Sequence, residues 1–177
     1  MIKNPWQTTK QNIIYQNKFG YTLRDDDVIT PAGKPGKYMV MESRDFAVIV
    51  ALTPNNKVVF ERHWRYPINQ ESLEIPAGGV EPGENPLETA KRELLEETGA
   101  TSAVWKKLIS YWTGNGAMKI RGHIFLAKDV IIKPDHPTEE TEKISVELID
   151  FNQALFKIDS GEITDDRTLL GLLYASK

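Results

Sequence analysis

The sequence of 177 residues contains no cysteine and only three histidines. The absence of cysteine excludes a disulfide framework and a cysteine-ligated zinc site. The sequence also lacks an apolar run that approaches the ~18 residues of a membrane-spanning helix. Its first residues, MIKNPWQTTK, lack the apolar segment of a signal peptide. We therefore expect a soluble, cytoplasmic protein with no membrane partner.

The chain also has little excess of charge of either sign, because 22 Lys and Arg residues oppose 25 Asp and Glu residues and leave a net charge of −3. The two signs are interspersed along the sequence, which argues against a surface that coats nucleic acid. We therefore expect no nucleic-acid partner. The length suits one domain, or one domain plus an N-terminal extension, with room for a substantial core.

The most informative segment runs from Gly78 to Ala100 and reads GGVEPGENPLETAKRELLEETGA. Asn85 is suited to cap a helix and Pro86 to occupy its first position. Gly99 is suited to end the helix in a left-handed conformation. At about 100° per residue, one side of this helix would carry Leu87, Ala90, Leu94 and Thr98. The sequence therefore predicts a helix between the asparagine and Gly99.

Charged residues fall on the neighbouring arc of this helix: Arg92, Glu93, Glu96 and Glu97. Glutamates at these spacings repel one another by a few tenths of a kcal/mol per pair, and the helix dipole disfavours an anion in the last turn. A divalent cation that prefers oxygen ligands, such as Mg²⁺ or Mn²⁺, would turn this repulsion into a binding site. On spacing alone, a solvated acidic face explains the pattern equally well.

The spacing of these residues resembles the Nudix box. Five residues separate Gly78 from Glu84, seven separate Glu84 from Arg92, and the segment ends in Arg-Glu-Leu-Leu-Glu-Glu-Thr-Gly, with Ala100 in place of a larger aliphatic residue. The preceding segment, ESLEIPAG, resembles the strand that enters the box in the ADP-ribose and nucleotide-sugar pyrophosphatase branch. Val59–Arg65 resembles that branch's strand ending in arginine.

This resemblance implies an α+β fold, the Nudix αβα sandwich with a mixed sheet, preceded by N-terminal antiparallel strands. The order of apolar segments agrees, because strands are followed by helices with one helix in mid-chain. We predict an N-terminal strand extension over residues 1–43, used for dimerisation and for the substrate site. A Nudix hydrolase domain would follow over residues 44–177. Relatives of this branch commonly form homodimers through N-terminal strands, so we expect a homodimer.

The metal ligands implied by the resemblance lie on the predicted helix and on the turn before the box. Glu93 and Glu97 would be the principal ligands, and Glu96 would hold a second or third ion. The backbone carbonyl of Ala77 would complete the site, since the Gly-Gly turn that follows lets the main chain approach closely. Arg92 would orient Glu93 or Glu96 through a bidentate pair without touching metal, and Glu84 would steady the loop or bind an outer ion.

Substrate contacts are expected outside the box. Arg65 resembles the branch's phosphate-contacting arginine, since a guanidinium suits a diphosphate. Glu74 would accept hydrogen bonds from sugar hydroxyls or brace the strand before the box. Trp6 would stack on the base, although ordinary packing explains the neighbouring N-terminal aromatic residues equally well. His63 and His123 need no catalytic role, because a strand histidine commonly serves packing.

The general base is not where the branch usually has it. Relatives carry a glutamate after a Ser-Pro-Gly-type turn, whereas residues 111–120 here read YWTGNGAMKI, with neither the proline nor an acid. The substitutes in the sequence are Glu139, Glu140 and Glu142, or Glu97 itself. We therefore count Glu140 and Glu142 among the catalytic candidates, together with Glu93, Glu97 and Arg92.

The implied activity is Mg²⁺-dependent hydrolysis of the pyrophosphate bond of a nucleoside diphosphate sugar, ADP-ribose or a relative, to a nucleoside monophosphate and a sugar phosphate. One alternative is a Nudix pyrophosphohydrolase acting on nucleoside triphosphates or dinucleoside polyphosphates. Another is a non-enzymatic nucleotide-sugar sensor. The segment Pro76–Gly79 and the strand ending in arginine favour the nucleotide-sugar branch. The presence of every box glutamate favours an enzyme over a sensor.

Overall fold

The computed structural model describes residues 4–133 and 144–177. It divides into two compact units. One unit comprises the chain up to Asp45 together with Trp112–Arg121, and the other comprises Phe46–Tyr111 together with Gly122–Lys177. The predicted domain boundary between residues 43 and 44 stays a prediction.

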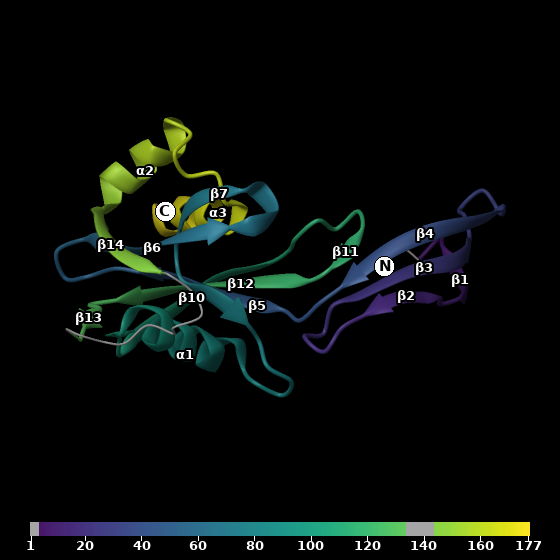
Figure 1. Ribbon diagram of the computed structural model, residues 1–177, viewed down its shortest axis with the longest axis horizontal. Coiled ribbons are helices and arrows are strands. Elements are labelled where there is room, and N and C mark those ends of the chain that lie inside the picture. Colours follow the sequence, from purple (N-terminus) through teal and green to yellow (C-terminus); the bar gives the residue numbers. More distant parts are fainter. Residues whose placement is uncertain (1–3, 134–143) are drawn as a thin grey trace. The chain divides into compact units, whose positions relative to one another are not determined.

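The N-terminal unit is built on one sheet whose strand order is β1-β3-β4-β11, with β2 paired to β3 (Figure 1). Strands β3 and β4 form an antiparallel hairpin, and Gly33 (φ 74°) lies in the turn between them. Strand β11 pairs in parallel with β4, which brings a later segment of the chain into this unit. The strands are β1 (Gln7–Lys10), β2 (Ile13–Gln16), β3 (Thr22–Ile29), β4 (Pro35–Glu42) and β11 (Met118–Lys119).

The larger unit contains a central sheet in the order β10-β12-β5-β8 and a second sheet in the order β14-β6-β7. The central sheet is mixed, because β12 runs parallel to β5 whereas β8 runs antiparallel to it. A short pair, β13 (Ile131–Ile132) with β9 (Ala100–Thr101), completes the strands of this unit. The other strands are β5 (Phe46–Ala51), β6 (Lys57–Arg65), β7 (Gln70–Glu74), β8 (Ala77–Gly79), β10 (Val104–Trp112), β12 (Arg121–Lys128) and β14 (Ser145–Asp150).

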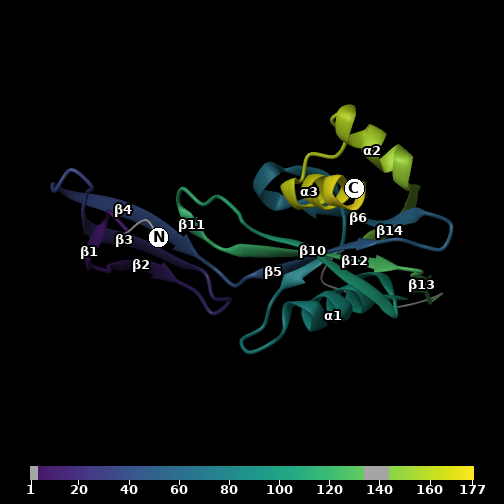
Figure 2. The ribbon, with the colours of Figure 1, turned by 180° about the vertical axis from the view of Figure 1, so that it is seen from behind.

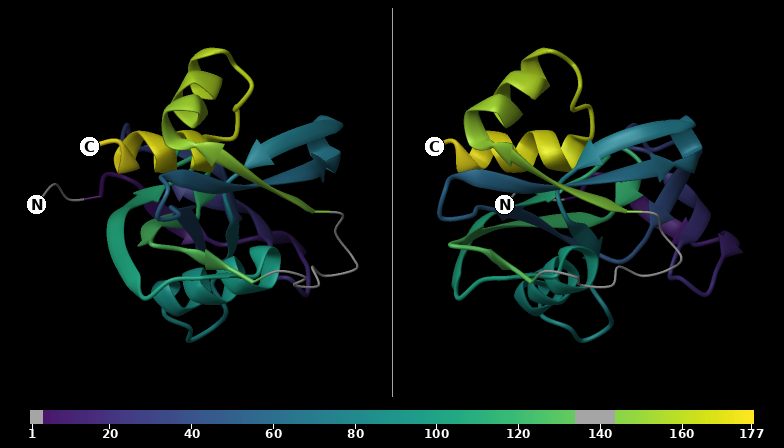
Figure 3. Two further views of the ribbon diagram at one scale, coloured as in Figure 1. Left: turned by 90° about the vertical axis from the view of Figure 1, so that its left-hand side faces the viewer. Right: turned by 60° about the vertical axis from the view of Figure 1, so that its left-hand side comes forward.

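Helices cover both faces of the central sheet. Figures 1 and 2 show α1 (Pro86–Thr98) on one side of β5 and α3 (Asp166–Ala175) on the other. Figure 3 shows α2 (Phe151–Asp159) directly after β14 and beside α3. A short 3-10 helix, η1 (Tyr66–Ile68), joins β6 to β7. This arrangement confirms the predicted α+β sandwich with a mixed sheet.

The helix boundaries follow from their capping residues. Asn85 accepts a hydrogen bond from the N–H of Leu87 at 2.9 Å, and Gly99 ends α1 with φ 67°. Both assignments were predicted from the sequence. Asp150 and Asp165 cap α2 and α3 in the same way.

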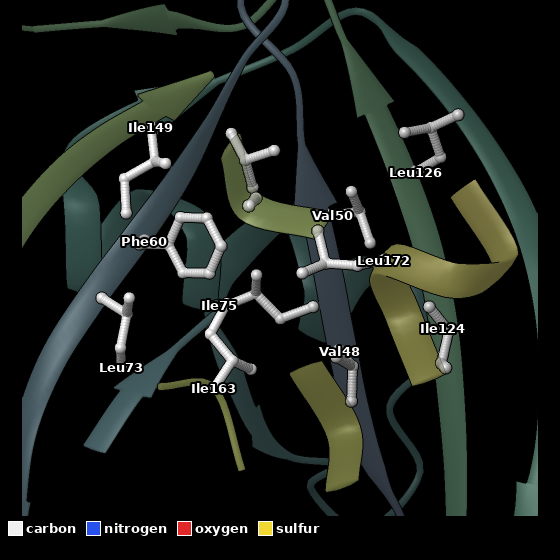
Figure 4. Packing of buried hydrophobic residues seen from close by; sticks show 12 residues of the cluster. Val48, Val50, Phe60, Leu73, Ile75, Ile124, Leu126, Ile149, Ile163 and Leu172 are labelled. Atoms are coloured by element: carbon white, nitrogen blue, oxygen red, sulfur yellow. The ribbon is translucent and has the colours of Figure 1, made fainter. Parts of the chain in front are cut away.

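The core of the larger unit lies on both faces of β5, since successive side chains of a strand point to opposite faces. Towards α3, Val48 and Val50 pack with residues of β6, β12 and α3, including Phe60 and Leu172 (Figure 4). Towards α1, Ile49 packs with other fully buried residues: Ala47, Ala51, Ala90 and Leu94. The apolar stripe predicted for α1 is therefore the face that packs on the sheet.

Several strands are short, among them β1, β8, β9, β11 and β13. Each depends on pairing with a distant segment rather than on a local apolar pattern. No helix in the described part of the chain is long and apolar enough to cross a membrane.

Candidate active site

The candidate site forms where α1 packs against the glycine turn of β8. A Cβ atom added to Gly78 would overlap the carboxyl group of Glu93, whereas one added to Gly79 would meet no atom within 4 Å. The first glycine is therefore needed for the close approach of the helix to the strand. This contact places the acidic arc of α1 beside the main chain of Ala77.

Glu97 is the most perturbed carboxyl group of this site. Its Oε2 accepts a hydrogen bond from the backbone N–H of Ala77 at 3.2 Å. Burial raises the pKa of Glu97 well above its usual range, and the negative charges of Glu61 and Glu93 raise it further. The ionised form of Glu97 is therefore disfavoured unless a cation lies nearby.

Glu93 is also largely buried, and this burial raises its pKa, although the nearby Arg92 partly offsets the effect. Arg92 connects several carboxylates at once. Its Nη1 lies 2.8 Å from Glu93 Oε1 and 2.9 Å from Glu96 Oε2. The bidentate partner of Arg92 is instead Glu84, with both nitrogen–oxygen distances at 3.3 Å. A bidentate pair with Glu93 or Glu96 was predicted; Arg92 instead contacts each of these two glutamates through Nη1 alone, and its role in orienting them stays a prediction.

Glu84 holds the loop that leads into α1. Its Oε2 accepts hydrogen bonds from the backbone N–H of Glu81 at 3.1 Å and from the hydroxyl of Thr89 at 2.8 Å. The hydrogen bonds from Arg92 lower the pKa of Glu84 most. Those from Thr89 and the Glu81 backbone lower it further, to about 2. A carboxylate with this many donors is fixed in place, so Glu84 steadies the loop.

The donor set fits a hard divalent cation, although its side chains are not arranged around a single point. Within residues 4–133 and 144–177, no three His, Asp or Glu side chains stand in a geometry that would hold a metal ion. Glu93 and Glu96 are engaged by Arg92 instead. Even so, the largely buried Glu97 lies close enough to the carboxylates of Glu61 and Glu93 for their charges to raise its pKa. A cation would relieve this repulsion.

One residue of this site, Glu61 of β6, was not found by sequence reasoning. It is 1% exposed, and its Oε2 lies 2.8 Å from Nε2 of His63. Of the histidines, His63 therefore pairs with a carboxylate beside the site, and His123 contacts the hydroxyl of Ser110. The sequence feature that could have indicated Glu61 is its place directly after the apolar run from Val58 to Phe60, whose residues are all buried.

A second feature of the larger unit is a pocket of about 460 Å³ at the ends of β6 and β7 and the start of α3. Arg65 and Glu74 both line it, as does Arg167. Burial alone would raise the pKa of Glu74, but the ion pairs with Arg65 and Arg167 lower it. Of the two roles predicted for Glu74, the structure supports bracing, whereas contact with a sugar stays a prediction. Sequence reasoning did not find Arg167.

Trp6 belongs to the N-terminal unit, where its ring packs edge-on against Tyr38 with centroids 5.2 Å apart. The atypical loop after β10 lies in the same unit: Tyr38 donates its hydroxyl to the carbonyl of Gly116 at 2.8 Å. This loop is therefore part of the packing of the N-terminal sheet. The predicted stacking role of Trp6 stays a prediction. Glu139, Glu140 and Glu142 lie outside the described residues.

Helices on both faces of a mixed sheet, with an acidic helix packed on a glycine turn, define a Nudix-type hydrolase fold. The NUDIX domain family model matches residues 43–169, and the chain belongs to the Nudix family. Its membership confirms the predicted resemblance and identifies the chain as a Nudix hydrolase.

The chain is similar to several curated relatives and to a solved structure. An ADP-ribose pyrophosphatase of Bacillus subtilis (strain 168) is 31% identical over 84% of this chain and 81% of its own length. A methanol dehydrogenase activator of Bacillus methanolicus is 33% identical over 86% of this chain and 83% of its own. The crystal structure of an ADP compounds hydrolase has the same fold, with a TM-score of 0.84 at 17% identity over 97% of this chain and 92% of that chain.

Proposed function

We propose that the protein is a Mg²⁺-dependent hydrolase that cleaves the pyrophosphate bond of a nucleoside diphosphate sugar. The observation that carries this proposal is the largely buried carboxylate of Glu97 at the β8 backbone, with Glu61 and Glu93 close enough to raise its pKa. Such a group of carboxylates is suited to a hard cation. Glu93 and Glu97 would hold Mg²⁺, or Mn²⁺ in its place, with Glu96 and the carbonyl of Ala77.

The bound cation would neutralise phosphoryl oxygens and lower the pKa of an attacking water. The residues of this chain would position the reactants. Arg92 holds Glu93 and Glu96 at the face of α1, and Arg65 would bind the diphosphate. Glu97 would accept the water's proton directly, unless Glu140 or Glu142 has this role. Addition of water across the P–O–P bridge yields a nucleoside monophosphate and a sugar phosphate.

ADP-ribose or a relative of it is the substrate class that we propose. The similarity to the Bacillus subtilis ADP-ribose pyrophosphatase over 84% of this chain supports this choice. The pocket at Arg65 supports it too, because a guanidinium among the lining residues suits a diphosphate. The base and the sugar would be selected by residues outside the box.

The test is hydrolysis of ADP-ribose, ADP-glucose, GDP-mannose, UDP-glucose, dinucleoside polyphosphates and nucleoside triphosphates, ranked by kcat/KM. A coupled phosphatase reports the monophosphate products. We expect the nucleoside diphosphate sugars to rank first, with activity that needs Mg²⁺ and is lost in Glu97→Gln. Glu88→Gln is a matched control, because Glu88 is exposed on the same helix and pairs with Lys91, three residues along, at 2.9 Å. Faster cleavage of triphosphates or dinucleotides would overturn the substrate assignment, and no turnover of any compound would favour a sensor.

We also propose that the N-terminal strands form a homodimer in the cytoplasm. Five large apolar side chains of this unit are more than half exposed: Ile13, Ile14, Tyr15, Phe19 and Met39. A second copy of the chain would cover such a surface. Light scattering after size-exclusion chromatography should give a dimer that Ile14→Glu converts to a monomer. Ile131→Glu, at an exposed position of the other unit, should remain dimeric; a wild-type monomer would contradict the proposal.

A further inference from the structure

Glu61 is a charged residue at a position where its strand otherwise buries apolar side chains. The three residues before it, Val58 to Phe60, are fully buried, and Glu61 itself is 1% exposed. A valine here would fill the space without the free energy that is needed to remove a carboxylate from water. Because a buried charge is unfavourable by itself, a residue of this kind normally has a hydrogen-bonding partner or a functional role.

The two oxygens of Glu61 differ in their surroundings. Oε2 lies 2.8 Å from Nε2 of His63, two residues along the same strand, so that this ring fixes the carboxylate. Oε1 is also buried, but within the described residues it has no hydrogen-bond partner. Leaving such an acceptor unsatisfied is unfavourable. The unsatisfied oxygen is therefore a candidate ligand atom.

Glu61 faces the carboxyl group of Glu97. After burial, the charge of Glu61 is the largest influence on the pKa of Glu97, ahead of that of Glu93, and the two side chains lie within hydrogen-bonding reach. Two carboxylates this close repel each other unless a proton or a cation lies between them. Glu61, a residue of β6 that lies outside the Nudix box, thus joins the group of acidic side chains on α1.

We propose that Glu61 supplies Oε1 as a further ligand to the divalent cation at Glu93 and Glu97, while His63 orients it through Oε2. The inference rests on the proposed function, because it assumes a cation at these two glutamates. A histidine that donates to one oxygen of a ligating carboxylate directs the other oxygen towards the metal. The partly apolar surroundings of Glu61 would strengthen its interaction with the cation.

Mn²⁺ binding to the metal-free full-length protein tests this inference without an activity measurement. Electron paramagnetic resonance of the free ion gives the Kd for wild type, Glu61→Gln, Glu97→Gln and Glu88→Gln. Glutamine keeps the shape of Glu61 and can still accept the hydrogen bond from His63. We expect Glu61→Gln to weaken Mn²⁺ binding about 10- to 100-fold. Glu97→Gln should lose binding, and Glu88→Gln should match wild type.

Thermal unfolding separates a ligand from a structural residue. Without metal, Glu61→Gln should unfold at the wild-type temperature or above it, because the variant no longer buries a charged carboxylate beside Glu97. Added Mn²⁺ should raise its Tm less than that of wild type. A lower metal-free Tm with unchanged Mn²⁺ affinity would overturn the inference and assign Glu61 to packing.

Glu61→Asp is a second variant in case the glutamine protein fails to fold. It keeps the charge and withdraws the oxygens by one methylene, so that Mn²⁺ binding should weaken again. Wild-type affinity in Glu61→Asp would overturn the inference while leaving the proposed function intact. A wild-type protein that binds no Mn²⁺ would instead refute the proposed metal site, and the role of Glu61 with it.

Discussion

Arg65 of β6 and Arg167 of α3 donate to the same oxygen, Oε2 of Glu74, at 2.6 and 2.8 Å. Glu74 is 3% exposed, so a single buried carboxylate is the shared counter-charge of two partly exposed guanidinium groups. Arg167 is held in addition by Asp165, the residue that caps α3. The helix start is thereby joined to the strand that carries the proposed diphosphate-binding arginine.

Removal of the Glu74 charge should destabilise the fold. Glu74→Gln would leave Arg65 and Arg167 close together without their shared counter-charge, at an expected loss of about 3 kcal/mol in the free energy of unfolding. Urea unfolding measures this loss. Glu147→Gln is the control. It breaks the ion pair of Glu147 with Arg62, which is more exposed to solvent than Glu74 is, and should lower the free energy of unfolding by at most about 1 kcal/mol.

The same variant should change the pH dependence of stability. The pKa of Glu74 is below its ordinary 4.5 in the folded protein, so its contribution is fully present above pH 4.5 and is lost as the pH falls below that value. The difference in unfolding free energy between wild type and Glu74→Gln should therefore shrink on acidification. An equal difference above and below pH 4.5 would show that the ion pairs contribute nothing.

Arg65→Lys should impair substrate binding more than the chemical step. Lysine keeps the charge but cannot reproduce the bidentate contact of a guanidinium with a diphosphate or with Glu74. We expect kcat/KM for ADP-ribose to fall about 10- to 100-fold, mainly through KM. Arg62→Lys on the same strand, where Arg62 pairs with Glu147, should stay near wild type. Equal effects of the two changes would argue against a substrate contact at Arg65.

Gly78→Ala should displace Glu93, because the added Cβ atom would overlap its carboxyl group. If Glu93 has its proposed role as a metal ligand, a shift of this kind is expected to lower kcat/KM about 100-fold. Steady-state kinetics on the folded variant, confirmed by circular dichroism, measures the effect. Gly79→Ala is the matched control, since its Cβ atom meets nothing within 4 Å. Full activity in Gly78→Ala would mean that the position of Glu93 does not matter.

Arg92→Lys should weaken the contacts that keep the acidic side chains of α1 in position. A lysine cannot reach Glu84, Glu93 and Glu96 at once, whereas the guanidinium does. The Mg²⁺ concentration that gives half-maximal activity should rise about tenfold, and saturating Mg²⁺ should restore most of the rate. Lys91→Arg, which changes the neighbouring exposed side chain, provides the control titration. An unchanged Mg²⁺ requirement would limit Arg92 to a structural role.

The sequence by itself determined the features that depend on local physics. The limits of α1 follow from Asn85 and Gly99, and its buried face follows from the spacing of its apolar residues. The alignment of Arg92 with Glu96 on one arc follows from helical periodicity in the same way. For these features, residues that are neighbours in the helix are also neighbours in sequence.

Only the tertiary structure decided which distant charges meet. Glu61 reaches Glu97 because β6 packs beside the α1–β8 contact, and Arg167 reaches Glu74 because α3 begins beside β7. No periodic pattern in the sequence predicts either contact, since each contact joins elements that are far apart along the chain. Strand β8 likewise exists through its pairing with β5. A sequence pattern gives the face on which a side chain lies, but the packing of the elements determines what that face meets.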